Sequence, residues 1–79
     1  MATLLLFGPA RSAAGLGRVQ LEARTVSELC DAARSQFGEE FTKGLAVSAL
    51  WLNGEPVEGD PSVAAGDEVA VVPPVSGGS

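Results

Sequence analysis

The sequence contains no histidine and a single cysteine, Cys30. One cysteine cannot form a disulfide within the chain, and a structural zinc site needs several cysteine or histidine ligands. The absence of histidine also removes the side chain that most often acts as a general base near neutral pH. The sequence therefore excludes an internal disulfide, and it excludes a catalytic centre built from cysteine and histidine. We predict no metal site.

Long hydrophobic runs and an N-terminal basic region are absent as well. The longest apolar run is Leu4-Leu5-Leu6-Phe7, whereas a membrane-spanning helix needs about 20 apolar residues. No basic region precedes this run, as it would in a signal peptide. We therefore expect a cytoplasmic protein that does not bind membranes.

Basic residues are absent from the C-terminal part of the chain. All five lysine and arginine residues lie at or before Lys43, whereas half of the ten acidic residues follow it, and the net charge is −5. This balance argues against nucleic-acid binding, which depends on basic surfaces. It favours a partner with a basic face, although solvated acidic loops give the same pattern.

The composition and the length of the chain indicate one small folded domain. Hydrophobic residues make up 46% and charged residues 19% of the 79 residues, which differs from the composition of disordered chains. A chain of this length has room for a single domain. We expect this domain over residues 1–72 and an extended, flexible C-terminal tail over residues 73–79.

Four segments have the length or the alternation of β-strands, and turn signals separate them. Residues 8–17, between the first two of these segments, are rich in Gly, Ala, Pro and Ser and are predicted as the loop of a hairpin. Asn53-Gly54 is a turn signal because both residues tolerate positive φ. Residues 55–67 after this turn are predicted mostly as a loop, with a short two-residue pairing around Pro56-Val57. The predicted strands are 3–7, 18–22, 49–53 and 68–72.

One segment predicts a helix with a defined start and end. Thr25-Val26-Ser27-Glu28 matches a capping box, apolar residues follow at helical spacing as far as Phe37, and Gly38 is placed to end the helix. Cys30 lies on the apolar face, so we interpret it as a core residue and not as a reactive thiol. Residues 39–47 are predicted only as a connection that places a few side chains in the core.

This order of elements predicts an α+β domain of the ubiquitin-like β-grasp kind, with one mixed sheet and a single main helix packed across one face. The alternation of the strands then places Leu5, Phe7, Trp51 and Val72 on the face that the helix does not cover. Exposed large apolar groups mark binding surfaces. Alternatively, loops cover these side chains, or the strand register differs by one residue.

The C-terminal segment is Pro73-Pro74-Val75-Ser76-Gly77-Gly78-Ser79. The two prolines favour an extended backbone, and the two glycines lack a Cβ atom, so the walls of another protein can approach the backbone closely. Such a segment can enter a narrow channel. The alternative is an ordinary frayed terminus of small residues.

Several motifs together resemble a known family. These are Leu6 to Arg11 after the first strand, Thr25 to Leu29, Leu52-Asn53-Gly54, and Gly66-Asp67-Glu68-Val69-Ala70 leading into Pro73 to Gly78. The last of them is the specific one. Over nearly its whole length the chain resembles the ubiquitin-like sulfur carriers of the MoaD and ThiS type, and most closely the small subunits of molybdopterin synthase (MoaD).

The resemblance implies a mechanism in which Gly78 carries the reacting group. An adenylating enzyme similar to ubiquitin activators (MoeB/ThiF-type) would use ATP to form an acyl-adenylate, and sulfur would replace AMP to leave a thiocarboxylate. The tail would then enter the large subunit of molybdopterin synthase (MoaE-type) and give sulfur to cyclic pyranopterin monophosphate. The carrier binds no cofactor itself and has no activity alone.

The resemblance also implies roles for single residues. Gly77 and Gly78 form the reacting end, and Pro73, Pro74, Val75 and Ser76 are the part of the tail that the partners hold. Phe7 and Val72 occupy positions where family members carry apolar residues that contact partners. Trp51 is added to these contacts from strand alternation alone.

One residue departs from the family pattern, because members end at the second glycine whereas this sequence continues to Ser79. Three explanations stay open. A protease removes the serine before activation, the serine is an artificial addition, or the chain is excised from a longer fused chain. Other functions also stay open. These are sulfur delivery for thiamin, cysteine or tRNA thiolation, protein modification through an isopeptide bond, and a ubiquitin-like interaction domain that never uses its tail.

Overall fold

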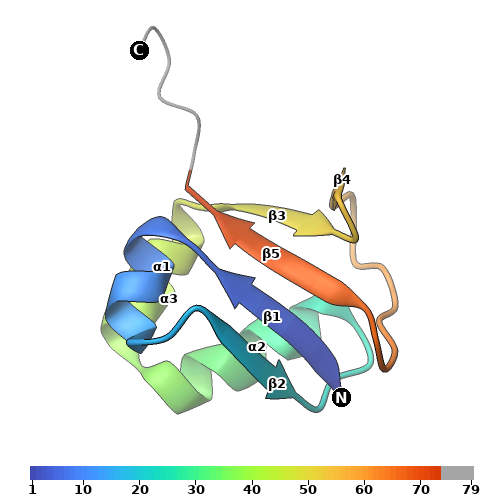
Figure 1. The fold of residues 1–79 in the computed structure, drawn as a ribbon, viewed down its shortest axis with the longest axis horizontal. Coiled ribbons are helices and arrows are strands. Elements are labelled where there is room, and N and C mark those ends of the chain that lie inside the picture. The colour runs from blue at the N-terminus through green and yellow to red at the C-terminus, as the bar shows by residue number, and fades with distance from the viewer. Residues whose placement is uncertain (74–79) are drawn as a thin grey trace, which may run out of the picture.

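A computed structural model describes residues 1–73 of the chain. These residues form five strands and three helices (Figure 1). The strands are β1 (Ala2–Leu6), β2 (Arg18–Leu21), β3 (Ala49–Leu52), β4 (Glu55–Pro56) and β5 (Glu68–Val72). The helices are α1 (Gly8–Ala14), α2 (Val26–Phe37) and α3 (Glu39–Ala46).

The strands form one mixed sheet in the order β2-β1-β5-β3-β4. The central strands β1 and β5 are parallel, and the other neighbours are antiparallel. Helix α2 crosses one face of this sheet, while α1 and α3 lie together at one end of it (Figure 1). The predicted α+β architecture with a main helix across one face of a mixed sheet is confirmed.

Helix α2 begins and ends where its sequence signals predicted. The Thr25 Oγ1 accepts a hydrogen bond from the Glu28 N–H at 3.2 Å. The Glu28 carboxylate accepts from the N–H of Arg24, one residue before the N-cap, at 3.0 Å, so the second bond of the capping box is displaced by one residue. Gly38 ends the helix with a φ of 87°.

The prediction of a loop over residues 8–17 is wrong, because residues 8–14 form helix α1. Pro9 stands in the first turn, where its missing N–H costs no intrahelical bond. Alanines follow, and Ala10 is buried against the core. The composition that suggested a loop is therefore also that of a short helix. The pairing of β1 with β2 as an antiparallel hairpin is confirmed.

The connection predicted over residues 39–47 is helix α3, so this prediction is also wrong. Glu39 and Glu40 lie in its first turn and Lys43 in its last turn, which complements the helix dipole. Phe41 and Leu45, four residues apart, are both buried, so α3 does place side chains in the core as expected.

The core lies between the sheet and the helices. Cys30 is buried there, which confirms that it is a core residue, and burial is the main cause that raises the pKa of its thiol. No helix among the described residues has both the length and the apolar character needed to cross a bilayer. The largest fully buried side chains are Leu4, Leu6, Leu29, Phe41, Val69 and Val71.

Gly44 of α3 lies against the backbone of α1. A Cβ atom at this position would be 3.1 Å from the Ala10 nitrogen and 3.3 Å from the Pro9 carbonyl carbon. Helix propensity alone would favour Gly44→Ala by about 1 kcal/mol, whereas overpacking against backbone atoms costs about 1–3 kcal/mol. We expect Gly44→Ala to lower the free energy of unfolding by up to about 2 kcal/mol in urea titrations.

Ser35→Ala, on the exposed side of α2, is the control for this substitution. It is also a change to alanine within a helix, and it should alter the free energy of unfolding by less than about 0.5 kcal/mol. A Gly44→Ala variant more stable than the wild type would contradict the close packing of α1 and α3.

The Asp67 carboxylate connects the start of β5 to the β3–β4 turn. It accepts hydrogen bonds from the Ala64 N–H at 2.8 Å and from the Asn53 Nδ2 at 3.1 Å. The Asn53 Oδ1 in turn accepts from the Glu68 N–H at 2.9 Å. The bond from Ala64, followed by the bond from Asn53, lowers the pKa of Asp67 below its ordinary value of 3.8.

Asp67 should therefore make stability depend on pH under acidic conditions. Because its folded-state pKa lies below the unfolded value, its stabilisation is fully present above 3.8 and is lost as the pH falls through the folded-state pKa. We expect Asp67→Asn to be less stable than the wild type in urea titrations at neutral pH, and this difference should shrink at about pH 2.5. An equal difference at both pH values would contradict the role of the carboxylate.

Candidate functional site

The face of the sheet that the helices leave uncovered is apolar at its centre. Strand register places two rows of side chains there. The first row contains Phe7, Val72 and Ala49, and the Phe7 N–H donates to the Val71 carbonyl at 3.1 Å, so Phe7 continues the line of β1. The second row consists of Leu5, Ala70, Trp51 and Pro56. We call the surface that these two rows form the outer apolar face.

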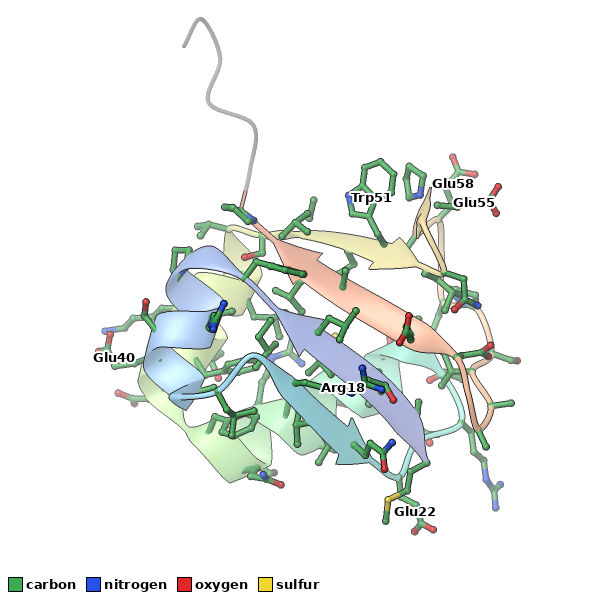
Figure 2. The ribbon with its side chains drawn as sticks, in the orientation of Figure 1. Arg18, Glu22, Glu40, Trp51, Glu55 and Glu58 are labelled. Atoms are coloured by element: carbon green, nitrogen blue, oxygen red, sulfur yellow. The ribbon has the colours of Figure 1, made fainter. Side chains whose placement is uncertain are left out.

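Two aromatic side chains on the outer apolar face are accessible to a partner. Phe7 is 43% exposed and Trp51 is 38% exposed. Arg18 of β2 and Glu68 of β5 form an ion pair of 3.8 Å across β1. Figure 2 shows Arg18 toward the β2 side of the sheet. The face thus combines an apolar centre with a charged margin, which is the arrangement of a protein-binding surface.

Pro73 leaves the sheet beside the start of α1. A Cβ atom on Gly8 would lie 3.2 Å from both Cβ and Cγ of Pro73, and Gly8 has a φ of 59°. Both the space and the backbone conformation therefore require glycine at position 8. This close approach fixes the base of the C-terminal segment next to Phe7 and Val72.

The structure brings three of the predicted partner-binding residues together and places a fourth nearby. Phe7, Val72 and Pro73 adjoin one another at the end of β5, and Trp51 belongs to the neighbouring row of the same face. The predicted outward orientation of Leu5, Phe7, Trp51 and Val72 is confirmed. Their roles in binding stay predictions. The other predicted site residues, Pro74, Val75, Ser76, Gly77 and Gly78, lie outside the described residues.

Sequence reasoning missed Pro56 as part of this face, although it lies directly opposite Trp51. Asn53 and Gly54 both have positive φ, at 49° and 86°, and form the two-residue turn between β3 and β4. This turn fixes the register, so the Asn-Gly signal could have identified Pro56 as the neighbour of Trp51.

The described residues contain neither a cluster of metal-binding side chains nor an accessible thiol. Within residues 1–73, no group of three or more histidine, cysteine, aspartate or glutamate side chains could hold a metal ion. The one thiol is buried, with a raised pKa, and is therefore a poor nucleophile. This part of the chain exposes an apolar face, and the segment that starts at Pro73 leaves the sheet beside it.

The sequence of residues 4–78 matches the ThiS family. The chain belongs to this family. The match covers the sheet, the helices and the C-terminal segment as far as Gly78. No curated protein sequence matches the chain significantly.

Solved structures of known proteins are similar to this member of the ThiS family over nearly its whole length. Small archaeal modifier protein 1 of Haloferax volcanii shares 28% identity with a TM-score of 0.77, and the match covers 98% of each chain. A protein in the complex of subunits 1 and 2 of the molybdopterin-converting factor of Helicobacter pylori 26695 shares 27% identity with a TM-score of 0.71. That match covers 98% of this chain and 97% of the other.

The same fold occurs in the solution structure of small archaeal modifier protein 1 of Methanosarcina acetivorans. Its TM-score is 0.79 at 21% identity, over 98% of this chain and 95% of that chain. The β-grasp fold is thereby confirmed. This ThiS-family protein is a β-grasp carrier of the ThiS/MoaD type or a modifier like the small archaeal proteins.

Proposed function

We propose that the chain is the sulfur-carrying small subunit of a molybdopterin synthase. The observation that supports this most strongly is the position of Pro73. It leaves the sheet between α1 and the outer apolar face, so a protein docked on Phe7 and Val72 would receive the segment that leads to Gly77-Gly78. The sequence Pro73-Pro74-Val75-Ser76 before the glycines favours the molybdopterin type of carrier over the thiamin type.

The reaction requires activation of the terminal carboxylate before sulfur can be attached. A carboxylate is a poor electrophile because its oxygen is a poor leaving group. Hydrolysis of the Gly78–Ser79 peptide bond first exposes the Gly78 carboxylate. A partner adenylating enzyme of the MoeB/ThiF type then transfers AMP from ATP to this carboxylate, with release of pyrophosphate. A sulfur nucleophile then displaces AMP, and a thiocarboxylate remains on Gly78. ATP is bound by the partner, and the carrier holds no cofactor of its own.

In the second step the large synthase subunit, of the MoaE type, binds the outer apolar face and receives the tail in its active site. The thiocarboxylate sulfur forms a bond to carbon of cyclic pyranopterin monophosphate, and water then hydrolyses the acyl carbon–sulfur bond, so the sulfur stays on the pterin and the carrier returns to the carboxylate form. Glycines at positions 77 and 78 keep the tail thin enough to reach a buried reaction centre. The partners supply the acid-base and electrostatic groups, and the carrier supplies the reacting acyl group.

The test combines a Gly78 thiocarboxylate form of the chain, the large subunit of molybdopterin synthase and cyclic pyranopterin monophosphate. We expect conversion of the pterin to molybdopterin with loss of the thiocarboxylate, and no conversion by the matched carboxylate form. Retention of the thiocarboxylate and of the pterin precursor in the complete mixture would contradict the proposal.

Modification of other proteins is the second candidate function. It is supported by the similarity to small archaeal modifier protein 1 of Haloferax volcanii, which is as close as that to the molybdopterin-converting factor protein. In this function the activated Gly78 acyl group is attacked by a lysine amine of a target protein, and an isopeptide bond forms. Higher-mass conjugates that contain the chain, in place of pterin conversion, would favour this alternative.

A further inference from the structure

Trp51 lies at a corner of the outer apolar face where a carboxylate also points outward. The indole is opposite Pro56 in the antiparallel pair of β3 with β4. The Val57 N–H donates to the Leu50 carbonyl at 3.0 Å, so the pairing continues by one residue beyond β4. The next residue, Glu58, therefore falls on the same side of the sheet as Trp51 and Pro56. Figure 2 shows Trp51, Glu55 and Glu58 at this corner, and Glu55, which pairs with Leu52, belongs to the other side of the sheet.

Glu58 has no basic partner among residues 1–73. The ion pairs of these residues involve other carboxylates, those of Glu68, Asp31 and Glu40. The sequence holds no lysine or arginine after Lys43. Arg18 of β2, opposite Leu5 of the outer apolar face, is already paired with Glu68. An exposed carboxylate thus lies on the same side of the sheet as the exposed indole, two residues beyond the position opposite it, a diagonal separation that long side chains can span. A cation from another molecule would complement both.

A guanidinium group fits this pair of side chains better than an ammonium group. Its planar face stacks on an indole ring, while its edge donates two parallel hydrogen bonds to a carboxylate. A lysine ammonium is more strongly hydrated and offers no planar fork.

We propose that Trp51 and Glu58 form an arginine-binding subsite of the outer apolar face. A partner protein places one arginine there, with its guanidinium stacked on the Trp51 indole and hydrogen-bonded to the Glu58 carboxylate. Phe7 and Val72 then anchor the apolar part of the interface, while this corner selects partners by charge. The inference rests on the proposed function only for the identity of the partner.

The first test uses the isolated chain and needs no partner protein. Trp51 is the only tryptophan and the chain has no tyrosine, so the emission excited near 295 nm comes from this residue. We expect triarginine amide to change this emission with an apparent affinity at least about 3-fold tighter than that of trilysine amide. Glu58→Gln should abolish this preference for arginine.

Glu22→Gln is the matched control, because it removes one negative charge at the opposite end of the molecule (Figure 2). It should keep the preference for triarginine. Equal affinities for the two peptides in the wild type, or a preference that Glu58→Gln leaves unchanged, would overturn the subsite.

The second test measures the dissociation constant for the large subunit of molybdopterin synthase by calorimetry. We expect Glu58→Gln and Trp51→Leu each to weaken binding by about 10-fold, and Trp51→Phe to weaken it less, because phenylalanine still offers an aromatic face. The double variant Trp51→Leu/Glu58→Gln should lose less than the product of the single losses, since both side chains hold the same guanidinium.

Independent, multiplicative losses in the second test would overturn the subsite, as would a Glu58→Gln variant that binds like Glu22→Gln. The two tests also separate this inference from the proposed function. A wild-type chain that prefers triarginine but does not bind the large subunit would support the subsite and contradict the assignment to molybdopterin synthase.

Discussion

Phe7→Asp is expected to weaken binding to the large subunit of molybdopterin synthase by about 30- to 1,000-fold, as measured by calorimetry. Phe7 is 43% exposed on the outer apolar face and adjoins the point where Pro73 leaves the sheet. A docked partner would bury this ring, and truncation of such an aromatic anchor costs about 2–4 kcal/mol of binding free energy. A buried, unpaired carboxylate adds a desolvation penalty.

The same substitution should leave the fold intact. Phe7 is the N-cap residue of α1, and its side chain makes no capping hydrogen bond. Aspartate is a favourable N-cap residue, so Phe7→Asp should preserve or raise the melting temperature while binding is lost. Gln36→Asp, an exposed position on α2 at the opposite face, introduces the same charge and should bind like the wild type. Equal affinities of Phe7→Asp and Gln36→Asp would contradict docking through the outer apolar face.

Phe41→Ala is expected to produce the largest loss of stability in the chain, about 3–5 kcal/mol in the free energy of unfolding. Phe41 is 0% exposed and is among the largest fully buried side chains. Its ring packs against Phe37, with the ring centroids 5.1 Å apart. Because domains are stable by only about 5–15 kcal/mol, this loss removes a large fraction of the free energy of unfolding.

Urea titration followed by far-ultraviolet circular dichroism measures this loss. Phe7→Ala is the matched control, because it removes the same ring from an exposed position and should cost less than about 1 kcal/mol. A loss below about 1 kcal/mol for Phe41→Ala would contradict the burial of the Phe41 side chain in the core.

The parts of the fold that sequence predicted well are those with short-range signals. The capping residues Thr25 and Gly38 delimit α2 because they satisfy local backbone groups, so their effect does not depend on distant contacts. Alternation predicted β5 with both ends correct, and it placed Phe7 and Trp51 on the outer face. These signals also sufficed for the fold class.

The parts that sequence did not predict depend on tertiary contacts. Helix α3 contains Gly44 in its interior, which by propensity alone disfavours a helix. The backbone of α1 approaches this glycine so closely that a larger residue would not fit, and only the packed structure shows this. The pairing of Trp51 with Pro56 was missed for a different reason: β4 is too short to recognise by alternation, and the register that the local Asn53-Gly54 turn sets was not used.

The central claim is that Gly78 carries sulfur as a thiocarboxylate, and intact mass spectrometry tests it most directly. A chain that ends at Gly78 is incubated with its adenylating enzyme, ATP and a sulfur donor, beside the 79-residue chain whose terminal carboxylate belongs to Ser79. We predict a gain of about 16 Da, the exchange of one oxygen for sulfur, in the chain that ends at Gly78 and no gain in the other. Equal gains in both chains, or no gain in either, would contradict the account.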